Sequence, residues 1–239
     1  MNTRPNPLSL ILLFAIPFAN SAEPAGELIF QDDFERSESQ EEKDEPGNGW
    51  GTNSEKRAKG NKQVDLRDGA MHIYIHKEAD HAVSVTHPAE FKDGIVRLRF
   101  MLENKDDSLG LNFADLKYKK VWAGHLFIAR VGTKFVQLSD LKTGVMDLGT
   151  RALKLEGKLT PEMQKGLKAK QKWKKQELET GKWYGLEVKV VGDTLSVAID
   201  GTVVASLSSE GIAHPTKRTL RLSVPKKAVI DDLKIWRLE

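Results

Sequence analysis

The sequence predicts an all-β protein, a sandwich or jelly roll of two antiparallel sheets with one Lys-rich helical insert. Apolar and polar residues alternate strictly in many short segments, such as 96–103 and 184–190. This period of two is typical of strands with one buried face. Turn residues separate the segments, and Asp200-Gly201 between two alternating runs predicts a tight hairpin. One stretch, 150–180, breaks the alternation and is rich in lysine.

Composition excludes several classes of protein. The chain has 239 residues and no Cys, so it has neither a disulfide framework nor a thiolate metal site. An apolar share of 39% is too high for a wholly disordered chain. The formal net charge of +3 is small for a nucleic-acid binder, and we expect no nucleic-acid partner.

The first 22 residues are predicted to be a secretory signal peptide. Arg4 precedes an almost wholly apolar run, 8–19, and the small residues 19–22 offer a cleavage site. The alternative is a membrane anchor, but about 12 apolar residues interrupted by Pro17 are too few to span a bilayer. We therefore expect a secreted or periplasmic protein, with one domain over 23–239 and no membrane span.

The first half of the mature chain is predicted to consist mostly of strands. Residues 28–30 form the first strand, and an acidic stretch, 35–45, and a loop around Trp50 follow it. Gly132-Thr133 is expected to join two later strands as a hairpin. The alternating segments after the loop are 71–75, 82–86, 96–103, 109–114, 124–131 and 134–141.

A helix is predicted at about 158–179, where the alternation stops. Thr160 is a good N-cap and Pro161 suits the first turn. Lys and Arg outnumber Glu by nine to three over 151–177. Such a helix either contacts acidic glycans or a phosphate-bearing surface, or it is a solvated face over a sheet edge, which we favour. Strands then resume at 184–190, 195–199, 203–205, 220–224 and 230–238.

His125 is the candidate reactive residue. It lies in an apolar strand and is expected to share a face with Phe127 and Ala129. A histidine among apolar neighbours is often only a satisfied, half-buried residue, and that alternative stays open.

Polar residues on the neighbouring strands give His125 a second interpretation. Arg99 and Asn112 are expected on the polar faces of adjacent strands, Gln137 lines up with them, and Trp122 is close in sequence. Aromatic rings stack on the C–H face of a sugar, and amide or guanidinium groups bond pairs of hydroxyls. The pattern therefore predicts a carbohydrate site on the open face of a sheet.

Two pairs of aspartates lie near the two ends of the mature chain. If the first and last strands pair, Asp32 and Asp232 come together and could hold a structural calcium ion. Capped strand ends explain the same residues. No cofactor is otherwise required.

Five segments together resemble a concanavalin A-like lectin/glucanase domain over nearly all of 27–238. They are the segments 30–34, Trp50, 68–72, 199–203 and 230–236. Within this superfamily the chain is most similar to the secreted bacterial domains called 3-keto-disaccharide hydrolase-like, or 3-keto-glucoside lyase/hydratase domains. The last segment also resembles the closing strand of glycoside hydrolase family 16, whose Glu-x-Asp-x-x-Glu pattern this sequence lacks, so that activity is not expected.

The resemblance implies a concanavalin A-like fold and a lyase or hydrolase acting on 3-keto-glucosides. His125 would be the base and Arg99 the group that stabilises the developing oxyanion. Asn112, Gln137 and Trp122 would contact the sugar. The alternative is a non-catalytic carbohydrate-binding module or a structural envelope module. The sequence leaves the sugar and the oligomeric state open.

Overall fold

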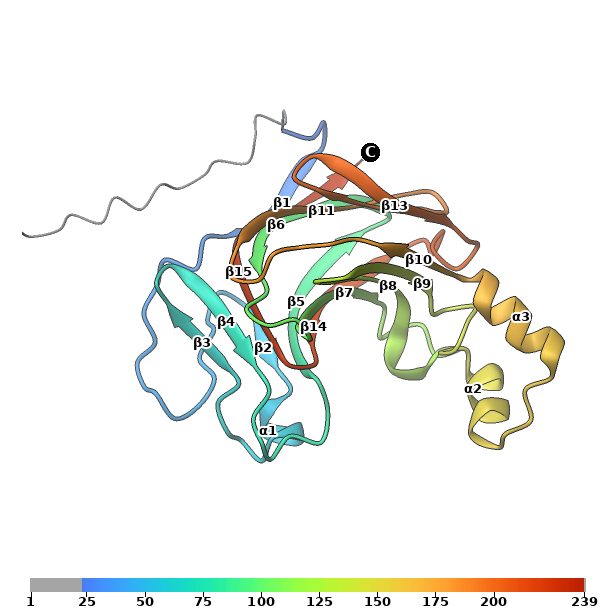
Figure 1. Cartoon of the computed structure of the whole chain (residues 1–239), viewed down its shortest axis with the longest axis horizontal. Helices are drawn as coiled ribbons and strands as arrows, with labels where there is room; N and C mark the ends of the chain where they lie inside the picture. Colours follow the sequence, from blue (N-terminus) through green and yellow to red (C-terminus); the bar gives the residue numbers. More distant parts are fainter. Residues whose placement is uncertain (1–22, 239) are drawn as a thin grey trace, which may run out of the picture.

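A computed structural model describes residues 23–238, and in this part of the chain two antiparallel sheets pack face to face (Figure 1). We call the eight-stranded sheet the back sheet and the seven-stranded sheet the front sheet. The predicted β-sandwich is confirmed. The predicted signal peptide falls on residues 1–22, which lie outside the described residues.

The back sheet contains both ends of the described chain. Its strands are β1 (Glu27–Asp32), β3 (Val64–Arg67), β4 (Ala70–Tyr74), β6 (Asp93–Met101), β11 (Trp183–Val191), β12 (Thr194–Ile199), β13 (Thr202–Ser208) and β15 (Lys227–Leu238). They lie in the order β13-β12-β11-β6-β15-β4-β3, and β1 also pairs with β15. Asp32 therefore lies opposite Leu233, so the first and last strands do pair, which is the condition on which the predicted calcium site depends.

The front sheet brings together strands that are far apart in sequence. Its strands are β2 (Gly51–Thr52), β5 (Val83–Phe91), β7 (Ser108–Ala114), β8 (His125–Gly132), β9 (Phe135–Asp140), β10 (Gln171–Lys175) and β14 (Lys217–Val224). They lie in the order β10-β9-β8-β7-β14-β5-β2. Strand β14 thus inserts between β5 and β7, which places late residues beside the middle of the chain.

The core lies between the two sheets and follows from the alternation in sequence. Leu98 and Phe100 from β6, and Leu111 and Phe113 from β7, are at most 1% exposed. Burying each such side chain stabilises the fold by about 1.5–3 kcal/mol. A continuous core of this kind stabilises the sandwich without disulfide bonds.

A tight two-residue hairpin forms at the predicted place. Asp200 and Gly201 join β12 to β13, with φ of 47° and 77°. Both values are in the left-handed region, which a two-residue hairpin turn of this type requires and which Gly and Asp tolerate.

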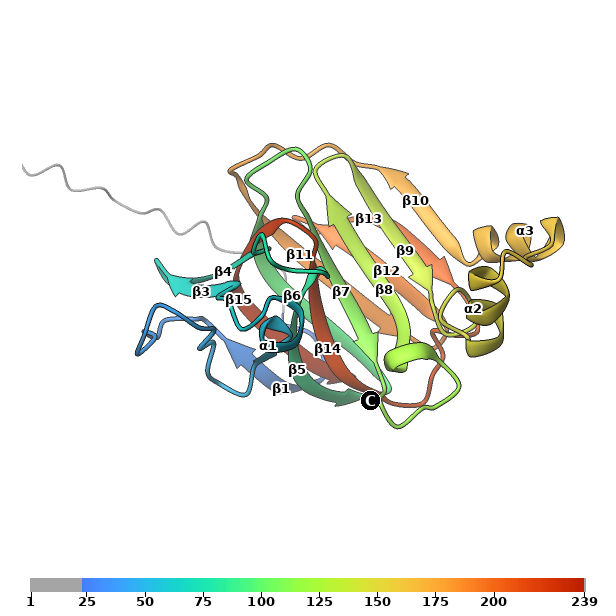
Figure 2. The same cartoon turned by 90° about the horizontal axis from the view of Figure 1, so that it is seen from below.

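The helical insert differs from its prediction in extent. Besides α1 (Ser54–Arg57) and the short η1 (Trp122–Gly124), two helices form, α2 (Leu148–Leu155) and α3 (Pro161–Ala169). Thr160 caps α3 as predicted, but the helix ends at Ala169, and residues 171–175 form the edge strand β10. Helix α2, whose N-cap is Asp147, was not predicted from the sequence. Figure 2 shows both helices beyond one end of β9.

Among residues 23–238, no helix is long and apolar enough to cross a membrane.

Candidate functional site

The outer face of the front sheet, here called the front face, carries several of the polar groups predicted for the site, including Asn112 and Gln137. In Figure 1 it is flanked by α1 on one side and by α2 and α3 on the other. Alternate residues of each strand point into the core, so the rest point outward. The outward residues of β14, β7, β8 and β9 include Thr219, Arg221, Ser223, Gly110, Asn112, Ala114, Ile128, Arg130, Gln137 and Ser139.

His125 and Asn112 meet on this face. Nδ1 of His125 lies 2.9 Å from Oδ1 of Asn112. Because an amide oxygen only accepts hydrogen bonds, Nδ1 carries the proton and the lone pair is on Nε2. The structure thus brings together two of the predicted site residues.

A bulge turns His125 toward the front face. The register shifts between Phe113 and Ala114, so that Phe113 lies opposite Phe127 and Ala114 lies opposite His125. Leu126 and Phe127 are then both buried. The expectation that His125 shares a face with Phe127 is therefore wrong, because the extra residue reverses the alternation at the start of β8.

Arg221 is the site residue that sequence reasoning missed. It lies opposite Asn112 on β14, and its Nη1 is 3.3 Å from Nδ1 of His125. Its Nη2 donates to the carbonyl of Ala123 at 2.9 Å. The alternation at 220–224 places Arg221 on a polar face, but no sequence pattern indicates that β14 pairs with β7.

The electrostatic surroundings of His125 are basic. Its pKa is lowered to about 4, first by burial and then by the nearby Arg221, His81 and Arg151. The imidazole is therefore neutral at physiological pH.

A second group of polar side chains lies farther along the front face. Nη1 of Arg130 donates to Oε1 of Gln137 at 3.2 Å, and Nε2 of Gln137 lies 3.4 Å from Oε1 of Gln171. Nε of Arg130 is buried and has no hydrogen-bond partner among the described residues. A cavity of about 480 Å³ opens beside Arg130, and its charged lining residues are Lys105, Lys134, Asp106 and Asp107.

Two exposed tryptophans lie near these groups. Trp122 is 52% exposed, and the guanidinium of Arg151 lies 4.5 Å from its ring centroid. Trp173 on β10 is opposite Gln137 and is 57% exposed. Large exposed aromatic rings are available for stacking.

Arg99 does not reach the front face. It lies on β6 of the back sheet, where it bonds Asp231 at 3.0 Å and stacks over Trp183. Its neighbours in sequence, Leu98 and Phe100, point into the core, so Arg99 points to the opposite side of the sandwich from His125. The expectation that Arg99 comes from a strand adjacent to His125 is wrong, because β6 pairs with β11 and β15.

Carboxylates are missing from the middle of the front face. Among the described residues, the outward positions of β14, β7, β8 and β9 carry no Asp or Glu. On the next strand Glu90 is exposed, but it pairs with Arg218. A glycosidase that works by two carboxylates needs both beside the scissile bond. These four strands do not supply them.

The residues predicted to hold calcium have other partners. Oδ1 and Oδ2 of Asp32 accept hydrogen bonds from Arg36 at 2.6 and 3.0 Å, and Oδ2 also accepts one from Trp50 at 2.8 Å. Asp32 and Asp232 line one surface cavity, and Oδ2 of Asp232 lies 3.6 Å from Nη1 of Arg99. Arg36 already supplies a positive charge to Asp32, so a calcium ion at this place would have to displace the Arg36–Asp32 pair, and the calcium site stays a prediction.

One other acidic cluster has the spacing of a metal site. The carboxylate oxygens of Glu38, Glu41 and Asp65 lie within 4.8 Å of one another and could hold a metal ion. Nζ of Lys62 lies at 2.8, 3.1 and 2.8 Å from Glu38, Glu41 and Asp65. Burial alone would lower the pKa of Lys62, but its bonds to the three carboxylates outweigh burial and raise it. An ammonium thus supplies the positive charge here.

No protein-family model matches the sequence, and a search of curated proteins finds no match. Solved structures do match. The laminarinase from Rhodothermus marinus superposes with a TM-score of 0.58 and 10% identity, over 90% of this chain and 99% of that one. The fold is a concanavalin A-like jelly roll. The carbohydrate-binding module CBM66 from Bacillus subtilis gives a TM-score of 0.52 and 12% identity, over 79% of this chain and 95% of that one. These likenesses concern the fold, and the resemblance to 3-keto-disaccharide hydrolase-like domains stays a prediction.

Proposed function

We propose that this protein binds glycans on its front face. One observation carries the proposal: planar amide and guanidinium groups from neighbouring strands share the front face, where the exposed Trp173 lies opposite Gln137. The exposed Trp122 lies in the turn just before His125. Aromatic rings stack on the C–H face of a pyranose, while such planar groups bond adjacent hydroxyls. The jelly-roll fold shared with a carbohydrate-binding module and a laminarinase supports the same function. We also propose that the protein is exported, since 1–22 has the pattern of a signal peptide.

Binding is tested by affinity electrophoresis against a panel of soluble polysaccharides. The variants Trp122→Ala and Trp173→Ala should each lower the affinity calculated from the retardation by about tenfold, because a stacking contact is worth about 1–2 kcal/mol. The matched control is Trp183→Ala, which removes a tryptophan from the back sheet. Retardation that falls equally in the control, or no retardation on any polysaccharide, contradicts the proposal.

A second candidate function is elimination from a 3-keto-glucoside, as the resemblance implies. The observation that favours it is the lone pair on Nε2 of His125, whose orientation is set by the Nδ1–H hydrogen bond to Asn112, with Nη1 of Arg221 3.5 Å from Nε2. Nε2 would remove the proton next to the keto carbon, and Arg221 would stabilise the enolate that forms. The enolate would then form a carbon–carbon double bond and break the glycosidic C–O bond, and the departing oxygen would take the proton back from Nε2. A pKa of about 4 makes His125 a poor base in the free protein, so binding is the function we put first.

A further inference from the structure

We propose that the glycan bound at the front face is acidic, and that Arg221 and Arg130 bind its carboxylate or sulfate groups. This inference rests on the glycan-binding function proposed above and names the chemical class of the ligand.

The arginines of the two sheets differ in their ion-pair partners. On the back sheet, Arg97 pairs with Glu187 at 2.6 Å and Arg99 pairs with Asp231 at 3.0 Å. On the front face, no described carboxylate lies within ion-pair distance of Arg130 or Arg221. The front face therefore presents two guanidinium groups that no described carboxylate pairs directly, although Asp106 and Asp107 line the cavity beside Arg130.

Both front-face arginines are partly withdrawn from water. Burial lowers the pKa of Arg130 and of Arg221. Their hydrogen bonds go to neutral groups, the side chain of Gln137 and the carbonyl of Ala123. Holding a desolvated cation without a counter-charge costs free energy, which a bound anion would offset.

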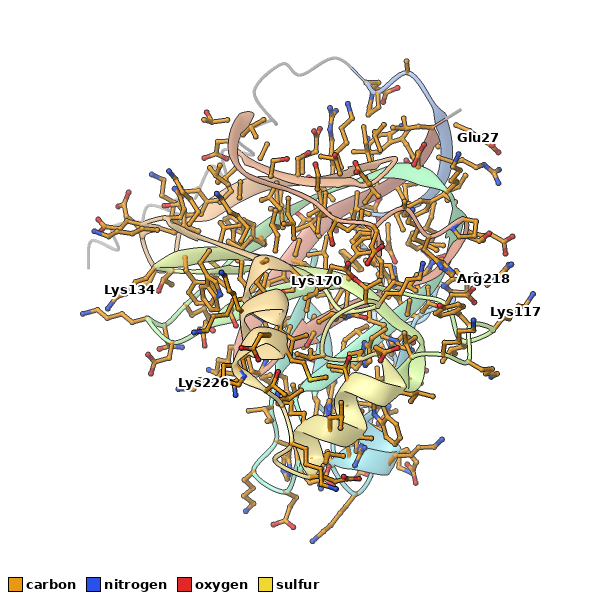
Figure 3. All side chains as sticks on the ribbon, turned by 90° about the vertical axis from the view of Figure 1, so that its right-hand side faces the viewer. Glu27, Lys117, Lys134, Lys170, Arg218 and Lys226 are labelled. Atoms are coloured by element: carbon orange, nitrogen blue, oxygen red, sulfur yellow. The ribbon has the colours of Figure 1, made fainter. Side chains whose placement is uncertain are left out.

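Basic groups outside the front sheet also lie near His125 and Arg221. Arg221 comes from β14, Arg151 from α2 and His81 from the loop before β5, and all three lower the pKa of His125. Lys105 and Lys134 line the cavity beside Arg130 together with Asp106 and Asp107, and Lys226 pairs with Asp106 at 3.1 Å. Figure 3 shows Lys134 and Lys226 on one side of the view, and Lys117 and Arg218 on the opposite side.

The aromatic and amide groups favour a sugar as the carrier of the anion. A guanidinium binds a carboxylate or a sulfate through two parallel hydrogen bonds. Trp122 and Trp173 offer flat apolar surfaces, and Asn112 and Gln137 offer paired hydrogen bonds. A uronate or a sulfated sugar combines all three features, whereas the small net charge of +3 gives no strong attraction for nucleic acid.

The test measures the affinity of the full mature chain for matched pairs of oligosaccharides by calorimetry. Oligogalacturonate is compared with its methyl ester, which keeps the ring and loses the charge. A sulfated carrageenan oligosaccharide is compared with a neutral agarose oligosaccharide. We expect at least one acidic member to bind about tenfold or more tightly than its neutral match, as charge-assisted bonds require. The pair that shows the difference identifies carboxylate or sulfate as the anion.

Variants of Arg221 and Arg130 test whether these two side chains cause the preference for the acidic sugar. Arg221→Gln and Arg130→Gln should each weaken binding of the acidic sugar by about tenfold. Arg221→Lys should weaken it less. The control Arg237→Gln removes an equal charge from the back sheet, where Arg237 pairs with Glu27, and should leave affinity unchanged. Binding of the acidic sugar should also raise the pKa of His125 in an NMR titration, and the neutral match should not raise it.

The outcomes separate this inference from the proposed function. Equal affinity for an acidic sugar and its neutral match, unaffected by Arg221→Gln, overturns the acidic ligand and leaves glycan binding intact. No binding to any glycan overturns both. Equal binding of single-stranded DNA with the same dependence on Arg221 overturns the inference in favour of a general anion-binding surface.

Discussion

Nη1 of Arg221 lies 3.3 Å from Nδ1 of His125, although 96 residues separate the two in sequence. The contact exists because β14 inserts beside β7 in the front sheet. It places a cation against an imidazole whose Nδ1 is already bonded to Asn112. The result is a neutral histidine in a basic, partly desolvated surface, and several measurable properties depend on it.

His125 should make the protein sensitive to acid. Its pKa in the folded state, about 4, is below the ordinary value of 6.5, so the unfolded chain binds the proton first as pH falls. The stability that the folded protein gains from keeping His125 neutral is complete above pH 6.5 and is lost as pH falls to 4. The loss is up to about 3 kcal/mol, because each pKa unit is worth about 1.4 kcal/mol.

Urea denaturation at pH 7 and pH 4.5 measures this loss. His125→Gln keeps a hydrogen-bond donor and does not titrate, so the variant should lose less stability between the two pH values than the parent. Comparing the two chains removes the contribution of other histidines with lowered pKa values, which are His72, His87 and His214. An identical loss in both chains would show that His125 does not titrate as described.

Replacing Lys62 should make stability depend on calcium. Lys62→Met leaves Glu38, Glu41 and Asp65 together without their cation, which should cost about 3 kcal/mol or more. Millimolar calcium should then recover part of the lost melting temperature in scanning calorimetry. The parent chain is expected to melt at the same temperature in calcium and in EDTA, since ammonium and guanidinium groups already neutralise its acidic clusters. A lower melting temperature of the parent in EDTA would reveal a native calcium site.

Gly124→Ala should destabilise the turn that leads into His125. Gly124 has φ of 72°, and an added Cβ would lie 2.6 Å from the carbonyl oxygen of Asp115. We expect a loss of about 2 kcal/mol or more, and weaker glycan binding because the adjacent carbonyl of Ala123 holds Arg221. Gly181→Ala is the matched control, with φ of 73° and no atom within 4 Å of the added Cβ. Only the backbone cost of about 1 kcal/mol is expected there. Equal losses of stability at the two positions would contradict this account.

The two candidate functions separate in His125→Gln. If the protein eliminates the leaving group of a 3-keto-glucoside, this variant should lose turnover by about a hundredfold or more while its affinity for the sugar changes little. The measurement is release of the leaving group under single-turnover conditions. Equal release by the parent and the variant would exclude His125 as the base.

Local features of the fold were predictable because they depend on neighbouring residues. The Asp200-Gly201 hairpin needs only two residues that tolerate positive φ, and both adopt it. The Thr160 cap depends on one hydroxyl and the amide of Met163. The end of the following helix was not predictable in this way, because Gln and Lys in 171–175 suit a helix and form a strand only by pairing with β9.

The candidate site was only half predictable for a related reason. Asn112 and Arg99 stand in equally regular alternating segments, and alternation does not say which sheet a strand joins. The sheet order places Asn112 on the front face and Arg99 on the back sheet, and it supplies Arg221 in its stead. The bulge that turns His125 outward also depends on pairing with β7.

The central claim, that glycans bind the front face, is tested most directly by following the indole N–H signals of the five tryptophans in a ¹⁵N-labelled sample. A bound oligosaccharide should shift the signals of Trp122 and Trp173, which are exposed near the front face. The signals of Trp50, Trp183 and Trp236 should stay in place. Shifts confined to Trp183 and Trp236, which belong to the back sheet, would contradict the account, as would the absence of any shift at a saturating sugar concentration.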